Sequence, residues 1–326
     1  MGTTCGRLRR LVQARPDGRS YRFGLRDSEA WFQHLQRNGH VVVGGALSRE
    51  EVAAAKDLIW QDLEEATPGL QRGDVATWRR WTLPPTGLNS RLAQGAGAWH
   101  VRGCEGVKRA FARVWGTSDL IVSMDCVIAW RPWWLERSWK PVTEGLHLDQ
   151  NPFSKPGLEC VQGMVPLVPV TSVTGGLQVV PASHTEKAKR EQKRRFPHLR
   201  STGDWCPLAC KDMKAQLLLA EAGDLILWDS RTIHGGVVGS GQPPDSPPEE
   251  CSTGRAELAR LAVTVAMTPR AWASEEVLKA RADGFQAGRN FNHSPHEAGT
   301  SAGTLRGGPR PGYKPIDLTP AQRALL

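Results

Sequence analysis

The chain has 326 residues, of which 40% are hydrophobic, and its formal net charge at pH 7 is +9. This hydrophobic fraction is enough for a sizeable buried core. We expect no membrane span and no secretory leader, because the sequence has no apolar run of about 18 residues and no apolar segment near its start.

The seven cysteines are scattered along the chain, and the one close pair, Cys206 and Cys210, has no second pair nearby. That pattern gives little support to a zinc module. Reduced thiols are the simpler interpretation. They favour an intracellular protein, with the cytoplasm as the expected compartment.

Residues 1–26 are rich in arginine and poor in acids. A disordered basic tail is the simplest prediction for such a composition. An organelle transit peptide has similar features, so organelle targeting stays open. Myristoylation is not expected, because its motif needs Ser or Thr at position 6, where this chain has Gly6.

The first third of the chain predicts mainly helices. Residues 27–40 form one helix, and residues 48–66 form a stronger one, in which Ser48 is the N-cap and Glu51 completes a capping box. Apolar residues recur at helical spacing along this second helix. The other elements expected here are a short strand within residues 39–47, a loop-like stretch at 67–87 and a helix near 104–115.

From residue 119 onward the pattern changes to short β-rich runs separated by turn residues. Repeated short strands without long alternating helices predict an antiparallel barrel or sandwich. The runs are DLIVSMDCVIAW (119–130), CVQGMVPLVPV (160–170), GLQVVPAS (176–183), GDLILWDS (223–230) and RLAVTVAMT (260–268), while QLLLAEAG (216–223) suits a strand or a helix.

Three segments interrupt or follow these strands. Residues 184–215 are charged and predict a helical insert, and residues 239–254 form a Pro/Ser-rich loop. Residues 283–326 form an irregular C-terminal extension that ends in a short helix capped by Thr319. The expected organisation is therefore one domain over residues 27–282, flanked by the tail and this extension.

Much of the positive charge lies in HTEKAKREQKRR, residues 184–195. Such a run is usually a solvated helix face, although it can attract an anionic substrate or a nucleic acid. No aromatic side chains alternate with these charges, so we expect no nucleic-acid partner. A small-molecule substrate is the expected partner, and the sequence leaves the oligomeric state open.

His147 and Asp149 lie two residues apart in the stretch TEGLHLDQNP. On a strand, residues i and i+2 point to the same face, so both side chains can approach one metal ion. His234 follows a β-rich run and offers a third ligand. Two histidines and one carboxylate form the facial triad of non-haem Fe(II) oxygenases, which leaves open positions on the metal.

The motifs around these residues resemble those of the phytanoyl-CoA dioxygenase family. In chain order they are HLDQNP (147–152), GGLQVVPASH (175–184) and GDLILWDSRTIHGG (223–236). The resemblance covers roughly residues 119–270. It implies a double-stranded β-helix, or jelly roll, in a mainly β fold with added N-terminal helices. It also implies Fe(II) at His147, Asp149 and His234, with 2-oxoglutarate as cosubstrate and O2 as oxidant.

In that family a basic residue at the start of a late strand binds the distal carboxylate of 2-oxoglutarate, and Arg260 has the corresponding place here. A guanidinium suits this role because its planar fork pairs with a carboxylate. Relatives usually place this arginine closer to the distal histidine than the 26 residues that separate His234 and Arg260. An insertion in the Pro/Ser-rich loop accounts for the difference. It also leaves Arg255 as a rival.

Four further polar residues are candidates for hydrogen bonds to the cosubstrate. Ser123 and Asp125 share a face of their β-rich run, Gln162 lies on the next run, and Thr232 is two residues before His234. An ordinary buried hydrogen bond is an equally good interpretation of each.

The stretch AWRPWWLERSW (129–139) contains four tryptophans. They either wall a substrate entrance or, by default, pack in the core. Among the remaining histidines, His184 is expected to be structural, and His293 and His296 are expected to be solvated in a polar tail.

Asp149 favours oxidation of a C–H bond over halogenation, because the related halogenases replace this acid with a small residue. The alkylation-repair dioxygenases share H-x-D but carry R-x5-R, whereas Arg255 and Arg260 give R-x4-R. The sequence thus predicts an Fe(II)- and 2-oxoglutarate-dependent dioxygenase that hydroxylates or otherwise oxidises a small organic molecule, releasing succinate and CO2. Two alternatives stay open: a metal-binding jelly roll that is a binder or isomerase, and a basic scaffold whose barrel is inactive.

Overall fold

The structure is a computed structural model of the chain. It describes residues 22–208, 212–241, 257–297, 299, 310 and 312–326. Its α-helices are α1 (Ser28–Asn38), α2 (Arg49–Ala66), α3 (Ala96–Gly103), α4 (Glu105–Trp115), α5 (Glu186–Arg195), α6 (Glu275–Gln286) and α7 (Pro320–Arg323). Short 3-10 helices lie at Val75–Arg80, Ser90–Leu92, Arg137–Trp139, Pro197–Ser201, Arg270–Trp272 and Pro295–Glu297.

The strands are short except for the last. In chain order they are β1 (Arg22–Gly24), β2 (His40–Gly44), β3 (Leu88–Asn89), β4 (Leu120–Val122), β5 (Val127–Trp130), β6 (His147–Leu148), β7 (Val161–Pro166), β8 (Gly175–Val179), β9 (Cys206–Pro207), β10 (Gln216–Leu217), β11 (Leu225–Asp229), β12 (His234–Val238) and β13 (Arg260–Pro269).

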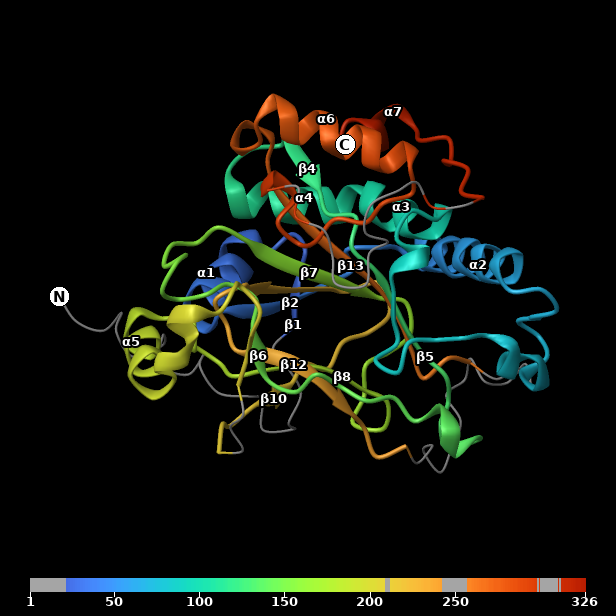
Figure 1. Cartoon of the computed structure of the whole chain (residues 1–326), viewed down its shortest axis with the longest axis horizontal. Helices are drawn as coiled ribbons and strands as arrows, with labels where there is room; N and C mark the ends of the chain where they lie inside the picture. Colours follow the sequence, from blue (N-terminus) through green and yellow to red (C-terminus); the bar gives the residue numbers. More distant parts are fainter. Residues whose placement is uncertain (1–21, 209–211, 242–256, 298, 300–309, 311) are drawn as a thin grey trace.

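These strands form two sheets that lie one above the other (Figure 1). The larger sheet has the order β1-β2-β11-β7-β13-β5-β3, with β4 also paired to β13, and the smaller has the order β10-β8-β12-β6-β9. Strands β5 to β8 alternate between the two sheets, and so do β11 to β13. This alternation is the winding of a double-stranded β-helix, so the predicted jelly-roll core is confirmed.

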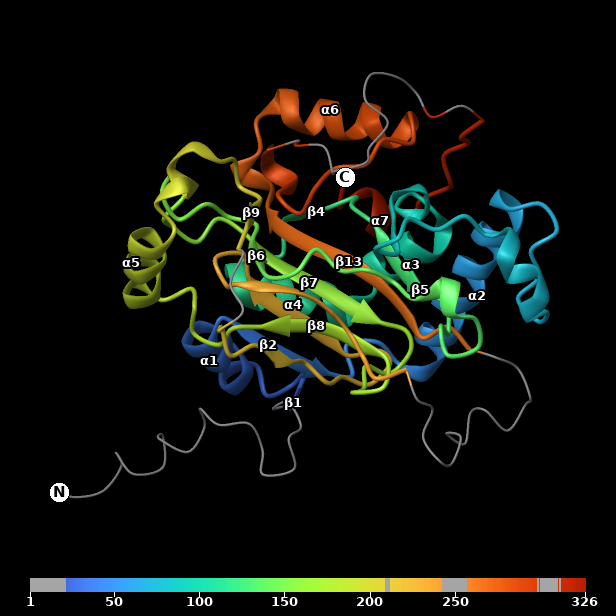
Figure 2. The same ribbon diagram turned by 60° about the horizontal axis from the view of Figure 1, so that its bottom comes forward.

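Helices cover the outer side of the larger sheet. Helix α1 contacts β2 and β11, and α3 and α4 contact β13. Figure 2 shows α6 at one end of the molecule, above the end of β13. The inner faces of the two sheets therefore remain available to form a cavity.

The N-terminal helices follow the predicted capping chemistry. The Ser48 hydroxyl accepts a hydrogen bond from the Glu51 amide, and the Glu51 carboxylate accepts one from the Ser48 amide. Helix α1 ends at Gly39, whose φ of 74° is in the left-handed region that glycine adopts without strain.

The prediction of a disordered basic tail over residues 1–26 extends too far, because its last residues form a strand. Residues 22–24 form β1, which pairs in parallel with β2. Arg22 donates two hydrogen bonds of 2.8 Å to the buried carboxylate of Asp224. That carboxylate also accepts hydrogen bonds from the amides of Gly45 and Glu221. The buried acid therefore ties the start of the described chain to the larger sheet.

The β-rich run at 119–130 forms two strands rather than one. β4 pairs with the end of β13, and β5 pairs with its beginning. Between them, the Thr264 hydroxyl accepts from the Cys126 amide and donates to the Cys126 carbonyl. This interruption breaks the simple alternation of side chains that the sequence predicts.

Other segments also differ from the sequence-based expectation. The segment 184–215 contains α5, a 3-10 helix and β9, which pairs with β6, so it is only partly helical. Helices α3 and α6 were not predicted, and α6 runs into the segment 283–326 that was expected to be irregular. The short final helix has its predicted Thr319 cap. No helix in the described ranges is long and apolar enough to span a membrane.

Candidate metal centre and its cavity

Two neighbouring strands of the smaller sheet bring the predicted ligands together. His147 on β6 lies directly opposite His234 on β12 in antiparallel register, and Asp149 follows β6. One potential ligand atom from each of these three side chains lies within 4.8 Å of the others. Asp149 Oδ2 is 3.2 Å from His234 Nε2, and Asp149 Oδ1 is 3.7 Å from His147 Nε2.

Backbone carbonyls orient both histidine rings. His147 Nδ1 lies 3.0 Å from the carbonyl oxygen of Gly145, and His234 Nδ1 lies 2.8 Å from that of Thr232. A carbonyl oxygen only accepts, so each Nδ1 that bonds to one carries the hydrogen, and each Nε2 lone pair is then available to a metal ion. A metal-ligating histidine needs this tautomer.

The electrostatics also suit a metal site. Burial, together with the nearby His234, lowers the pKa of His147 to about 4. Burial alone would raise the pKa of the Asp149 carboxyl, but His293, His234 and His147 together hold this pKa well below its ordinary value. Near neutral pH the site therefore presents a neutral His147 and an ionised carboxylate, the forms that bind a metal ion.

Gln162 holds the carboxylate in place. Its Nε2 donates a hydrogen bond of 2.9 Å to Asp149 Oδ2. Gln162 was predicted to bind the cosubstrate, and it does line the cavity, but one N–H of its side-chain amide is used by Asp149.

The triad lies in a cavity of about 590 Å³ between the two sheets. Its walls combine aromatic and aliphatic side chains with polar and charged groups. The lining includes Leu88, Asp125, Ile128, Trp130, Glu144, His147, Asp149, Gln162, Met164, Leu177, Asp204, Trp205, Trp228, His234, Arg260 and His293. Such a mixture is typical of sites for small organic ligands.

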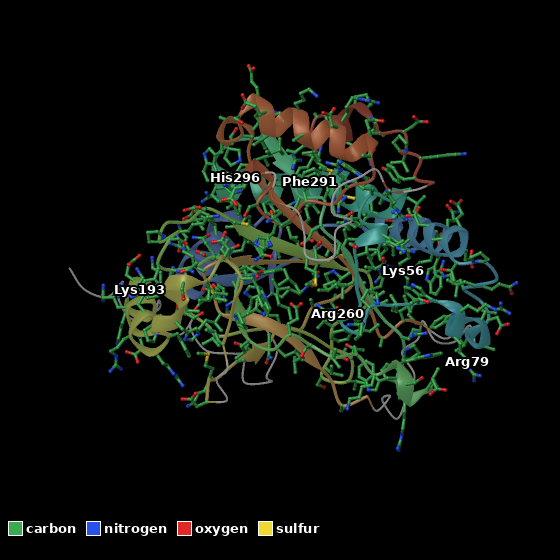
Figure 3. The ribbon with its side chains drawn as sticks, viewed as in Figure 1. Lys56, Arg79, Lys193, Arg260, Phe291 and His296 are labelled. Carbon is green, nitrogen blue, oxygen red and sulfur yellow. The ribbon has the colours of Figure 1, made fainter. Side chains whose placement is uncertain are left out.

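Arg260, the first residue of β13, points into this cavity from the larger sheet (Figure 3). Its guanidinium lies 4.5 Å from the ring centroid of Trp130, and Nη2 is 3.3 Å from Met164 Sδ. Its Nε has no hydrogen-bond partner, and no carboxylate among the described residues pairs with it. Burial lowers the pKa of Arg260 to about 10. The rival Arg255 lies outside the described residues.

Two predicted cosubstrate residues have structural roles instead. The Ser123 hydroxyl accepts a hydrogen bond from the Ala266 amide, and the Thr232 hydroxyl donates one to the Gly39 carbonyl. Both side chains are buried, and neither lines the cavity. Ser123 was predicted from strand alternation, and Thr232 from its proximity to His234 in the sequence. The interruption between β4 and β5 breaks the alternation on which the Ser123 prediction relied. Asp125 does line the cavity.

The other histidines fall into two groups. His184 is buried, and its Nε2 lies 2.9 Å from the Gln36 carbonyl, which agrees with a structural role. The prediction of solvated residues is wrong for His293, which lines the cavity with a side chain only 21% exposed. It is also wrong for His296, whose side chain is 13% exposed.

The sequence reasoning missed several cavity residues. Trp205 and Trp228 lie near the metal ligands, with ring centroids 6.4 Å from His147 and 5.4 Å from His234, respectively. Of the four tryptophans at 129–139, Trp130 lines the cavity, whereas Trp139 packs on Trp78. Trp228 lies in a predicted strand of the barrel, so its place in the cavity could have been found from the sequence. No local pattern indicates that His293 lines the cavity.

The fold and the two-histidine, one-carboxylate centre define a jelly-roll protein with a candidate metal site in its barrel. Within that class, residues 105–238 match the phytanoyl-CoA dioxygenase (PhyH) family, which confirms the resemblance of the sequence motifs. The matched segment contains His147, Asp149 and His234. Arg260 and His293 lie beyond its end.

Individual proteins are also similar to this chain. The chain is 27% identical over 286 residues to "Ava biosynthesis cluster protein O" of Aspergillus versicolor, covering 82% of this chain and 86% of the relative. Hypothetical protein JW0805 from Escherichia coli has a similar fold, with a TM-score of 0.55 and 14% identity over 93% of this chain and 85% of its own. The epimerase SnoN, solved with Fe3+, alpha ketoglutarate and nogalamycin RO, gives a TM-score of 0.45 and 18% identity, with coverage of 74% and 83%.

Proposed function

We propose that the protein is an Fe(II)- and 2-oxoglutarate-dependent oxygenase that oxidises a C–H bond of a small organic molecule. One observation carries the proposal: the triad of His147, Asp149 and His234 shares a cavity with Arg260, a buried cation without an anionic partner among the described residues. The family match supports an enzyme of this kind. The name of the Aspergillus relative, a biosynthesis cluster protein, supports a small-molecule substrate.

The residues present fit both groups. Two imidazole nitrogens and one carboxylate suit Fe(II) and leave coordination positions for a bidentate cosubstrate and O2. A buried guanidinium without an anionic partner is costly, and the distal carboxylate of 2-oxoglutarate would supply that partner. A metal binder or isomerase that uses no 2-oxoglutarate gives Arg260 no such role.

With iron and 2-oxoglutarate bound, the centre supplies oxidation by O2, in which one oxygen atom enters the substrate and the other enters succinate as CO2 is released. The chain's own residues hold and orient these groups. His147, Asp149 and His234 hold the metal, and Gln162 fixes the carboxylate through its hydrogen bond. Arg260 binds the cosubstrate, and the aromatic walls limit the access of water.

The experiment is anaerobic loading followed by turnover. Purified protein with Fe(II) and 2-oxoglutarate is expected to develop a metal-to-ligand charge-transfer absorption band, and to form succinate after O2 is admitted. His147→Ala should abolish both signals. Zinc as the resident metal, without calorimetric binding of 2-oxoglutarate, would contradict the proposal and favour a non-oxygenase metal protein. A panel of small molecules, scored by products that gain one oxygen, then addresses the substrate.

A further inference from the structure

The segment that follows α6 returns to the cavity. Asn292, His293 and Ser294 all line the cavity that holds the triad. This segment lies outside residues 105–238, the part that matches the family. The wall it forms is therefore a feature of this chain beyond the matched region.

Several contacts fix the backbone around His293. The Phe291 amide donates a 2.9 Å hydrogen bond to the Met124 carbonyl, and Asn290 Nδ2 donates one of 2.6 Å to the Asp125 carbonyl. Cys160 Sγ lies 3.0 Å from the His293 carbonyl oxygen, to which it donates. Phe291 itself is buried. The position of His293 is therefore set by packing against the barrel.

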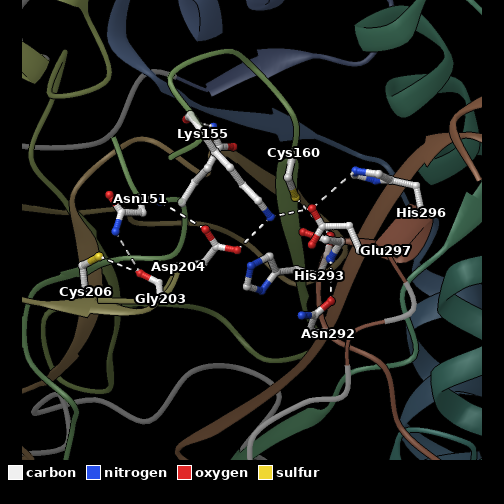
Figure 4. Close-up of polar contacts among 12 residues, drawn as sticks. Asn151, Lys155, Cys160, Gly203, Asp204, Cys206, Asn292, His293, His296 and Glu297 are labelled. Carbon is white, nitrogen blue, oxygen red and sulfur yellow. Dashed lines mark hydrogen bonds and ion pairs between the residues drawn. The ribbon is translucent and has the colours of Figure 1, made fainter. Parts of the chain in front are cut away.

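Ion pairs of Lys155 hold the chain just beyond the wall that residues 292–294 form. Its ammonium lies 2.8 Å from Asp204 Oδ2 and 2.5 Å from Glu297 Oε1, as Figure 4 shows. Burial lowers the pKa of Lys155, but its hydrogen bonds to the two carboxylates outweigh this effect and raise the pKa overall. The three residues, here called the Lys155 latch, join the loop after β6, the segment before β9 and the C-terminal segment.

The His293 ring lies within ion-pair distance of Asp149 but does not hydrogen-bond to it. The 4.0 Å separation between His293 Nδ1 and Asp149 Oδ2 exceeds a hydrogen bond, and Oδ2 already accepts from Gln162. Among the described residues, no side-chain hydrogen bond occupies the His293 ring nitrogens. A largely buried imidazole without a hydrogen-bond partner, next to a metal ligand, is therefore available to a molecule in the cavity.

We propose that His293 is a substrate-positioning residue, held in the cavity by the Lys155 latch, that hydrogen-bonds a hydroxyl or carbonyl oxygen of the substrate beside the metal. The tryptophan and aliphatic walls would take the apolar body of the same molecule. The inference rests on the proposed function, because it assigns a role within that site.

The first test uses nitric oxide as a stand-in for O2 on the anaerobic protein loaded with Fe(II) and 2-oxoglutarate. His293→Ala should keep the charge-transfer band but shift the rhombicity of the iron–nitrosyl EPR signal, because a hydrogen-bonding group beside the open positions is lost. The control is His198→Ala, which changes an exposed histidine that does not line the cavity and should leave both signals unchanged. His293→Gln, which keeps a hydrogen-bonding side chain, should restore part of the wild-type signal.

The outcomes separate the two proposals. A wild-type protein that shows no charge-transfer band overturns the proposed function, and this inference with it. A His293→Ala variant that keeps the band and an unchanged nitrosyl spectrum overturns only the role of His293. Loss of iron binding in His293→Ala would make this residue a metal ligand, which also contradicts the inference. Once a substrate is found, His293→Ala should raise its KM by a larger factor than it lowers kcat.

A second test examines the latch in the metal-free full chain. Lys155→Met should accelerate hydrogen exchange of the amides in residues 290–297 and 202–205, and leave β13 protected. Lys279→Met is the control, because it breaks an exposed lysine–aspartate pair on α6. Equal exchange in Lys155→Met and wild type would show that the latch does not hold this wall.

Discussion

Burial of the charged Arg260 side chain costs free energy, which a bound anionic ligand would offset. Its buried guanidinium has no anionic partner in the described part of the chain. We expect Arg260→Met to raise the melting temperature of the cosubstrate-free protein, because an uncompensated buried charge is removed. The same variant should bind 2-oxoglutarate at least about 30-fold more weakly, since loss of a buried charged partner costs roughly 2–5 kcal/mol.

Calorimetry and titration of the charge-transfer band measure the two effects separately. Arg260→Lys keeps a positive charge but loses the planar fork, so its affinity for 2-oxoglutarate should lie between those of wild type and Arg260→Met. Wild-type affinity in Arg260→Met would transfer the role to another cation, with Arg255 as the first candidate.

A substitution of Gln162 tests whether metal affinity depends on a residue that is not itself a proposed ligand. Gln162→Leu removes the hydrogen bond to Asp149 Oδ2 and should weaken metal affinity by about 10- to 100-fold. Competition with a chromophoric chelator measures this affinity. Ser123→Ala is the control: its hydroxyl bonds only the β13 backbone, so it should cost about 1 kcal/mol of stability and leave the metal affinity unchanged.

At the residue scale, the sequence predicted what local spacing and chemistry determine. His147 and Asp149 follow from a two-residue period and His234 from the chemistry of a two-histidine, one-carboxylate site, whereas Arg260 comes from the family resemblance. Ser123 and Thr232 were assigned to the cosubstrate on the assumption of an unbroken strand, and their hydroxyls bond backbone atoms instead. His293 depends on a contact between distant segments, and such a contact leaves no local pattern.

Among the elements, β1 is held in place both by the ion pair of Arg22 with Asp224 and by its pairing with β2. Asp224→Ala should destabilise the protein by about 3 kcal/mol, because it leaves two backbone amides and the Arg22 guanidinium without their acceptor. The value is at the low end for a buried pair, because the Arg22 side chain is 47% exposed and can be rehydrated.

Urea unfolding of Asp224→Ala, Arg22→Ala and the double variant measures this coupling. The double variant should lose clearly less stability than the sum of the two single losses. Simple additivity would mean that β1 contributes to the fold without this ion pair.

The predicted elements were those with caps or clear periodicity. Helix α2 was found because Ser48 and Glu51 form a capping box. Helix α6 has a similar N-cap, Ser274, so it was predictable by the same reasoning. Helix α3 is harder, because its sequence AGAWHVRG contains two glycines and lies among loop-like residues. The division of 119–130 into β4 and β5 depends on pairing with β13, which the local sequence does not encode.

For the molecule as a whole, two histidines away from the metal centre should make stability depend on pH. Burial is the main cause that lowers the pKa of His34 and of His40, each to about 4. In the unfolded chain these pKa values return to about 6.5, so below that pH the unfolded state binds more protons. Stability should therefore fall as the pH is lowered from about 6.5 to about 4, by up to about 1.4 kcal/mol per pH unit for each histidine.

Urea unfolding of metal-free protein across this pH range measures the slope. The double variant His34→Gln/His40→Gln should make it shallower and leave the part due to His147, whereas the His198→Gln control, which changes an exposed histidine, should not change it. An unchanged slope in the double variant would show that these histidines are not the source of the pH dependence.

The overall architecture was predictable because the short strands indicate an antiparallel barrel or sandwich, and the resemblance of three motifs to the phytanoyl-CoA dioxygenase family implies a jelly roll. The shape of the cavity was not. Its walls combine strands of both sheets with residues 204–205 and 292–294, which meet only in the folded chain. Sequence reasoning thus identified the centre of the site, but not the surface that faces the substrate.

The pairing of His147 with His234 also has a consequence for how the chain reaches its native state. Asp149 and His234 are 85 positions apart in the sequence, so they meet only after β6 and β12 have paired, although a long segment of chain separates these strands. Non-local pairings of this kind form slowly because loop closure must come first. A metal ion that responds optically to its ligands, such as Co(II), would then report the moment at which the smaller sheet closes. Refolding followed by its colour should lag behind the early recovery of helical signal.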